Sequence, residues 1–202
     1  MLETNVTSVP AVDPEDVARA QVYRLLSAFL SAAPDKEKLE IAAALEGDET
    51  PMGKAVGRFA TIAAKTDRAT VSQEYNDLFI GLGRGELLPY GSYYLTGFLH
   101  EKPLARLRNA LSRLGIERDP AIKEPEDHIA FVTEVMAGLI MGDFGEPQDL
   151  DIQHTFFEDH VGSWAPHFFA DLEKAKSSVL YAALGLVGKE FMEIEREAFA
   201  LD

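Results

Sequence analysis

Apolar residues recur every three or four positions along almost the whole sequence, and strand-like alternation of apolar and polar residues is scarce. This spacing is typical of amphipathic helices that bury one face, so we predict an all-α protein of about ten helices. Prolines and capping side chains such as Asp13 and Thr50 indicate where several helices begin. The predicted helices cover residues 14–33, 36–45, 51–65, 70–80, 93–100, 103–114, 125–141, 147–162, 166–174 and 178–199.

Residues 81–92, GLGRGELLPYGS, interrupt this helical pattern. They contain four glycines and one proline in twelve residues, a composition that cannot continue a helix. We predict that residues 13–202 form a single domain. This segment would be a hinge between its two helical halves. Residues 1–12 are expected to form a disordered tail. The segment is no phosphate-binding P-loop, because it lacks the lysine and the following Ser or Thr, and no strand precedes it.

Composition and charge narrow the classes of partner. The chain of 202 residues is 47% apolar, enough for one sizeable core, and it contains no cysteine for disulfides, thiolate zinc sites or Fe–S ligation. Its net charge of −15 disfavours nucleic acids and anionic membranes but favours cationic partners. The N-terminus has no export-signal pattern, and the apolar runs are far shorter than the about 20 residues that span a bilayer. We therefore expect a cytoplasmic protein without membrane insertion.

The stretch KEPEDHIAFVTEVM, residues 123–136, places charged residues at the start of a segment that is otherwise apolar. With Pro125 at the first helical position, Glu126 and Asp127 would lie in the first turn, where acids complement the helix dipole. His128 would begin the buried stripe of this central helix. One interpretation is a capped core helix. The other is a contact for a cation or a peptide, because a carboxylate stands beside a titratable ring.

A second stretch, EYNDLFIGLGRGELLPYGSYYL at residues 74–95, gathers aromatic and acidic side chains around the glycine-rich bend. Such a set suits an arginine-bearing peptide, because guanidinium groups stack on aromatic rings and pair with carboxylates. Our hypothesis is that Asp127 pairs with arginine, with Glu124 or Glu86 as further candidate partners, and that His128 orients or hydrogen-bonds the peptide. A packed turn between the two halves would have the same composition, so both interpretations stay open.

The motifs E-Y-x-x-L-F-x-G, P-Y-x-S-x-Y and E-P-x-D-H-I, followed by FFEDHVGSWAPHFFADL, resemble the TorD/DmsD family of redox-enzyme maturation chaperones over about residues 15–195. The resemblance implies an all-helical cytoplasmic chaperone that binds the twin-arginine signal peptide and the body of a molybdenum-cofactor enzyme subunit. Such a chaperone aids cofactor insertion and delays export. The peptide-binding residues that it implies are Asp127, His128, Glu124, Pro125, Phe79, Gly83, Pro89, Tyr90 and Ser92.

The resulting hypothesis is a binding protein without catalytic residues, metal or cofactor. Two rivals remain: a metal- or nucleotide-dependent hydrolase that uses Asp127, His128 and the later histidines, and a helical adaptor without peptide specificity. His154, His160 and His167 do not share a metal-binding spacing, and HExxH is absent. We expect a monomer or a domain-swapped dimer, because a flexible linker between packed halves permits swapping.

Overall fold

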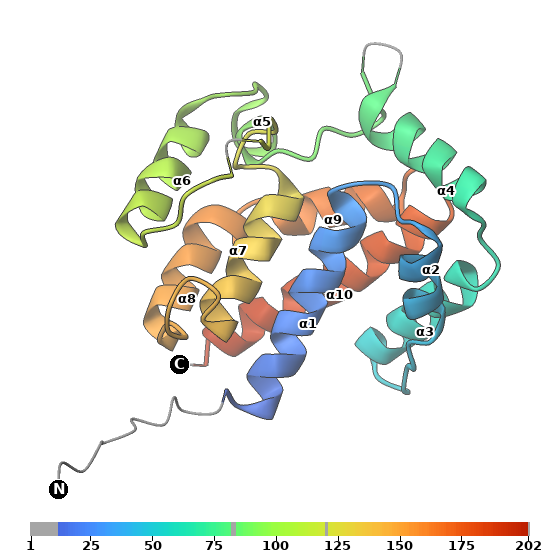
Figure 1. Ribbon diagram of the computed structural model, residues 1–202, viewed down its shortest axis with the longest axis horizontal. Helices are drawn as coiled ribbons and strands as arrows, with labels where there is room; N and C mark the ends of the chain where they lie inside the picture. The colour runs from blue at the N-terminus through green and yellow to red at the C-terminus, as the bar shows by residue number, and fades with distance from the viewer. Residues whose placement is uncertain (1–11, 82–83, 120, 202) are drawn as a thin grey trace, which may run out of the picture.

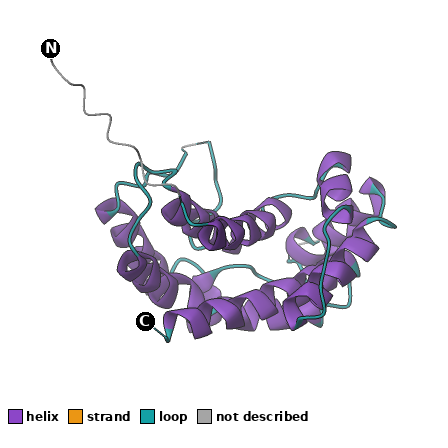
Figure 2. Ribbon diagram, turned by 90° about the horizontal axis from the view of Figure 1, so that it is seen from below, coloured by secondary structure: helices purple, strands orange, loops and turns teal. Residues whose placement is uncertain are grey.

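The computed structural model describes residues 12–81, 84–119 and 121–201 of the chain. Over these residues the regular structure consists of ten α-helices and two π-helical turns, and no strand occurs there (Figures 1 and 2). The all-α class and the count of about ten helices are therefore confirmed. The elements are α1 Pro14–Leu30, α2 Lys36–Ala43, α3 Pro51–Ala63, α4 Arg68–Tyr75, η1 Asn76–Ile80, α5 Gly91–Thr96, α6 Lys102–Arg113, α7 Ile129–Met141, α8 Leu150–Phe157, η2 Glu158–Gly162, α9 Ala165–Glu173 and α10 Leu180–Phe199. The predicted tail lies outside the described residues, apart from Val12.

Several helices begin where the sequence predicts, because a side chain satisfies their first free amides. The Asp13 carboxylate accepts a hydrogen bond from the Glu15 N–H at 2.9 Å, and Pro14 follows at the first helical position. Thr50 caps α3 in the same way, with its hydroxyl 3.0 Å from the Gly53 N–H. These caps are local in sequence, which is why the pattern of residues predicted them.

Helix α7 lies in the middle of the core and is buried around most of its circumference. Helix α1 packs along α7, while α9 and α3 pack against α10, the longest helix. Gly185 and Gly188 let α9 approach α10 closely: a Cβ at Gly188 would lie 2.2 Å from the Phe169 ring. Helices from the two ends of the chain thus share one core, and in Figure 1 α5 and α6 lie on one side of it and α2, α3 and α4 on the other.

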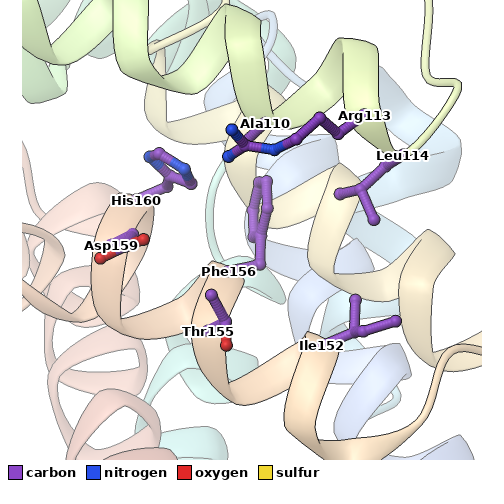
Figure 3. A pocket seen from close by; sticks show the side chains of 8 residues that line it. All are labelled: Ala110, Arg113, Leu114, Ile152, Thr155, Phe156, Asp159 and His160. Atoms are coloured by element: carbon purple, nitrogen blue, oxygen red, sulfur yellow. The ribbon is translucent and has the colours of Figure 1, made fainter.

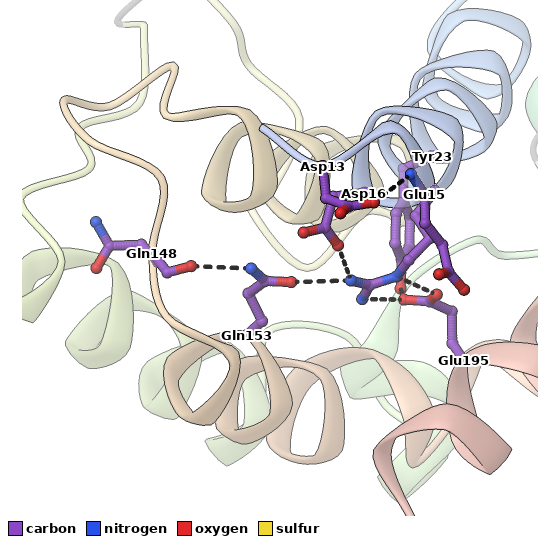
Figure 4. Close-up of polar contacts among 8 residues, drawn as sticks. Asp13, Glu15, Asp16, Tyr23, Gln148, Gln153 and Glu195 are labelled. Carbon is purple, nitrogen blue, oxygen red and sulfur yellow. Dashed lines mark hydrogen bonds and ion pairs between the residues drawn. The ribbon is translucent and has the colours of Figure 1, made fainter. Parts of the chain in front are cut away.

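One ion pair crosses this core and ties α1 to α10 (Figure 4). The Arg19 guanidinium donates to both carboxylate oxygens of Glu195, at 2.8 and 2.9 Å, and Glu195 is completely buried. The Tyr23 hydroxyl donates to the same carboxylate at 2.9 Å, and Asp16 binds the guanidinium at 2.7 Å. Burial, followed by this carboxylate, raises the pKa of Tyr23. Every charged atom of the pair is hydrogen-bonded, which a buried charge requires.

The start of the central helix differs from the prediction. Helix α7 begins at Ile129 rather than at Pro125, and His128 is its N-cap. Residues 125–127 precede the helix, so Glu126 and Asp127 do not lie in its first turn. The reason is tertiary, because backbone groups on both sides of His128 pair with residues 89–91 of another segment. Other boundaries also differ from the prediction: residues 76–80 and 158–162 form π-helical turns, and α8 begins at Leu150 rather than at Pro147. The helix predicted over residues 93–100 is Gly91–Thr96, and α1 ends at Leu30.

Candidate functional site

The two motifs that carry the candidate residues meet at one junction. Tyr90 and His128 form an isolated antiparallel bridge. The Ile129 N–H donates to the Pro89 carbonyl, and the Gly91 N–H donates to the Asp127 carbonyl, both at 2.9 Å. Residues 89–91 therefore run antiparallel to residues 127–129 and bring together side chains that are more than thirty positions apart in the sequence.

Asp127 holds this junction together from inside. Its side chain is 4% exposed, and its Oδ2 accepts a hydrogen bond from the Ser92 N–H at 2.7 Å. A carboxylate from one motif thus satisfies a free amide in the first turn of α5 in the other motif. Its Oδ1 and the hydroxyl of Ser92 are buried without a hydrogen-bond partner among the described residues. A contact between Asp127 and a peptide, as the sequence hypothesis has it, would have to reach that remaining oxygen.

His128 lies next to Asp127 and is 8% exposed. Its Nδ1 accepts a hydrogen bond from the Ala130 N–H at 3.1 Å, and its ring meets the Tyr90 ring edge-on at 5.2 Å. Burial lowers the pKa of His128 to about 4, although the carboxylates of Glu124 and Asp127 oppose that shift. The ring is therefore neutral at pH 7 and carries its proton on Nε2. With its lone pair on Nδ1 occupied, it is better suited to donate a hydrogen bond than to act as a general base.

The solvent side of the junction is aromatic and negative. The hydroxyl of the half-buried Tyr90 donates to Oε2 of the exposed Glu124 at 2.5 Å. Burial raises the pKa of Tyr90, and so does Glu124; the same two causes raise the pKa of Tyr75. The Tyr75 hydroxyl donates to the carbonyl oxygens of Leu30 and Ser31, at 3.4 and 3.2 Å. The negative end of the α1 dipole thus faces the same region.

Phe79 and Glu86, two other candidates, lie on the neighbouring side. Phe79 packs against Tyr75 and Tyr181, with ring centroids 5.1 and 5.6 Å apart, and extends the aromatic surface toward α10. Glu86 is engaged elsewhere, because its carboxylate accepts from the backbone N–H groups of Lys176 and Ser177 at 2.9 and 3.0 Å. A hydrogen bond from the Ser177 side chain, followed by that from Lys176, lowers the pKa of Glu86. Glu86 thus anchors the connection between α9 and α10.

The junction therefore brings together Pro89, Tyr90, Ser92, Glu124, Pro125, Asp127 and His128, with Phe79 next to them through Tyr75. Gly83 lies outside the described residues. The sequence hypothesis missed the C-terminal end of α1 as part of this region, since nothing in residues 28–31 distinguishes it from an ordinary helix end. Tyr75 is one of the aromatic residues that the sequence places around the glycine-rich bend, but its contact with this helix end has no signal in the local sequence.

Among the residues that the structure describes, no group of three or more metal-binding side chains lies close enough to hold an ion. In that same part of the chain, no helix has both the length and the apolar composition needed to cross a bilayer.

The chain is similar to a known protein family and to several characterised relatives. Residues 45–170 match the family model of the nitrate reductase delta subunit. The chaperone protein TorD of Aliivibrio fischeri is 28% identical over 191 residues, which cover 84% of this chain and 89% of that protein. TorD of Aliivibrio salmonicida is 27% identical over 198 residues, or 88% and 92% of the two chains. Among solved structures, a protein from Archaeoglobus fulgidus named as a candidate redox enzyme maturation protein superposes with a TM-score of 0.57, at 25% identity over 87% of this chain and 93% of that one.

Proposed function

The chain belongs to the nitrate reductase delta subunit family and, within it, to the TorD-type redox-enzyme maturation chaperones, and on this premise we propose that it binds the twin-arginine signal peptide of a molybdenum-cofactor oxidoreductase. Its relatives are named chaperones rather than enzymes, which agrees with a binding role. In the proposal, the protein acts in the cytoplasm, also contacts the body of the enzyme subunit, and delays export until the cofactor is inserted.

The observation that carries this proposal is the junction between residues 89–92 and 124–129. An arginine side chain is planar and presents five N–H donors, so it needs a carboxylate at its edge and an aromatic ring at its face. Glu124 supplies the exposed carboxylate and Tyr90 the adjoining ring, with their side chains joined at 2.5 Å. The Tyr90 hydroxyl occupies only one oxygen of Glu124, so the other can receive a guanidinium donor.

The neighbouring residues supply the other contacts that an extended peptide needs. Nε2 of His128 can donate to a peptide carbonyl, because Nδ1 is held by Ala130. The aromatic surface of Tyr75 and Phe79 can cover an apolar stretch that follows the arginines. Asp127 acts as a positioning residue in this proposal, since it fixes Ser92 and, through it, the start of α5. The net charge of −15 would speed the encounter with a cationic peptide.

The test is calorimetric titration of the full-length protein with a twin-arginine signal peptide and with the same peptide carrying two alanines in place of the arginines. The arginine peptide should bind more tightly. Glu124→Gln keeps an acceptor for Tyr90 but removes the charge, so affinity should fall about tenfold, the equivalent of about 1.4 kcal/mol for one charge-assisted contact.

Glu197→Gln, an exposed change near the far end of α10, is the matched control and should bind as the wild type does. Equal affinity for the two peptides would refute arginine recognition. An unchanged affinity in the folded Glu124→Gln protein would remove Glu124 from the site.

A further inference from the structure

A cleft separates α6 from α8 and η2 (Figure 3), and none of the residues that line it belongs to the proposed peptide site. It consists of two adjoining pockets of about 180 and about 520 Å³, both lined by Arg113, Asp159 and His160. The half-buried ring of His160 packs on Phe156 inside the cleft, at 5.1 Å between ring centroids. Arg113 on one wall of the cleft is positively charged, and Asp159 on the other wall is negatively charged.

The wall formed by α6 is basic. Lys102, Arg106, Asn109 and Arg113 are all exposed and recur at intervals of four, three and four residues, so they form one ridge along the helix. We call it the basic ridge. Helix α6 contains four basic side chains and no acidic one, within a chain whose net charge is −15. Such a concentration of positive charge is unusual in a chain with this negative net charge.

The opposite wall is acidic. Asp151, Thr155, Glu158 and Asp159 are exposed and follow one face of α8 and η2; we call them the acidic ridge. The two ridges run antiparallel, because one pocket joins Arg113 to Ile152 and the other joins Arg106 to Ser163. Figure 3 shows Arg113 and Asp159 on the facing elements.

The charges on these ridges are not paired with each other. Within the described part of the chain, no carboxylate oxygen lies within 4.0 Å of the charged nitrogens of Lys102, Arg106 or Arg113. The carboxylates of the acidic ridge likewise have no basic group within that distance there. The cleft keeps the ridges apart, so each ridge can form its ion pairs only with another surface.

We propose that this surface is the same face of a second copy of the chain. A twofold axis that lies in the interface and runs along the cleft exchanges the two walls and preserves the position along the groove. Each basic ridge then lies on the acidic ridge of the other copy, and every contact occurs twice. A surface that carries two ridges of opposite charge side by side is complementary to itself under this operation. A wholly basic face would repel its copy.

Apolar side chains extend the face beyond the ion pairs. Leu95 of α5, 39% exposed, lines the larger pocket, and Phe98, 70% exposed, follows three residues later in the connection to α6. Their burial would add the apolar contact that exposed ion pairs alone do not supply. The proposed dimer leaves the segment 81–92 in its own copy and so differs from a domain-swapped dimer.

The test is sedimentation equilibrium of the full-length protein over a concentration series up to about 1 mM. This range detects self-association with a Kd below about 1 mM. The wild type should dimerise at about 50 mM NaCl and dissociate several-fold more readily at about 500 mM, because salt screens exposed charges. Arg106→Glu with Arg113→Glu makes both walls acidic, and Glu158→Arg with Asp159→Arg makes both basic. Each double variant should dimerise at least tenfold more weakly alone, and an equimolar mixture of the two should associate again.

The matched control is Arg58→Glu with Arg68→Glu, at exposed positions on α3 and α4. It changes the net charge by the same amount as Arg106→Glu with Arg113→Glu and should dimerise as the wild type does. Circular dichroism establishes that each variant is folded. A wild type that stays monomeric throughout overturns the proposal. A dimer that all variants form equally, as a domain-swapped dimer would, overturns it too. Binding of an acidic partner or of inorganic phosphate by the basic ridge in a monomeric protein would assign the face to that ligand instead.

Discussion

Protonation of His128 should destabilise the fold in a defined pH range. The folded protein holds the pKa of this ring near 4, whereas the unfolded chain titrates near the usual value of 6.5. Between these values the unfolded state binds one proton more than the folded state, so the free energy of unfolding falls as the pH drops below 6.5 and stops falling near pH 4. At about 1.4 kcal/mol per pKa unit, the full loss is about 3 kcal/mol, of which about 2.5 kcal/mol should appear between pH 7 and pH 4.5.

The assay is urea unfolding at a series of pH values, followed by circular dichroism and by the fluorescence of Trp164, which is buried. His128→Asn is the informative variant, because asparagine is a good N-cap and can accept from the Ala130 N–H without titrating. The carboxylates titrate in both proteins, so their contribution cancels in the difference between wild type and variant. The wild type should therefore lose about 2.5 kcal/mol relative to His128→Asn between pH 7 and pH 4.5.

His167→Asn, which removes an exposed ring on α9, is the control and should leave the acid-induced loss in place. If the difference between the wild type and His128→Asn stays constant from pH 7 to pH 4.5, the ring is not held neutral by burial. In that case the assignment of Nδ1 as the acceptor at the start of α7 is wrong as well.

Substitutions at three further positions test the packing around the site and the core. Glu195→Ala should cost about 3–5 kcal/mol in the free energy of unfolding, because it leaves the guanidinium of Arg19 without its main partner; urea unfolding that shows less than about 1 kcal/mol would contradict this. Gly188→Ala should cost about 1–3 kcal/mol and lower the thermal midpoint, because its methyl group would meet the Phe169 ring; an unchanged midpoint would show that α9 can move away. Asp127→Ala should cost about 1–3 kcal/mol through one lost buried hydrogen bond, and Asp127→Asn clearly less, because an amide oxygen can still accept; equal costs would mean that the carboxylate charge matters more than the bond.

The sequence predicted those parts of the fold that local chemistry determines. Helices α1 and α3 begin where a capping side chain precedes a proline, and both signals lie within three residues of the helix start. The prediction failed at α7, where Pro125 is an equally good local signal. There the backbone on either side of His128 is paired with residues 89–91, and a hydrogen bond to a distant segment leaves no trace in the local pattern.

The same limit explains what could and could not be predicted about the site. The motifs predict which segments carry the candidate residues, but they do not show which carboxylates are already engaged within the fold. Glu74 and Glu86 look like members of an acidic rim in the sequence, yet both are engaged at the start of α10 or just before it: Glu74 accepts from the N–H groups of Val179 and Leu180 at 3.1 Å. Glu124 remains exposed on the solvent side of the junction. Only the three-dimensional arrangement separates a carboxylate that stabilises a loop from one that can meet a ligand.

The most direct test of the proposed peptide site is a map of the backbone amides whose nuclear magnetic resonance signals shift when a twin-arginine signal peptide is added to the labelled protein. The amides of Gly91, Ser92, Ile129 and Ala130 take part in the hydrogen bonds that join the two motifs, so they report on any ligand bound there. We predict that these four signals shift with the arginine peptide and stay in place with the dialanine peptide. Shifts confined to helices remote from the junction, with these four amides unaffected, would contradict the account.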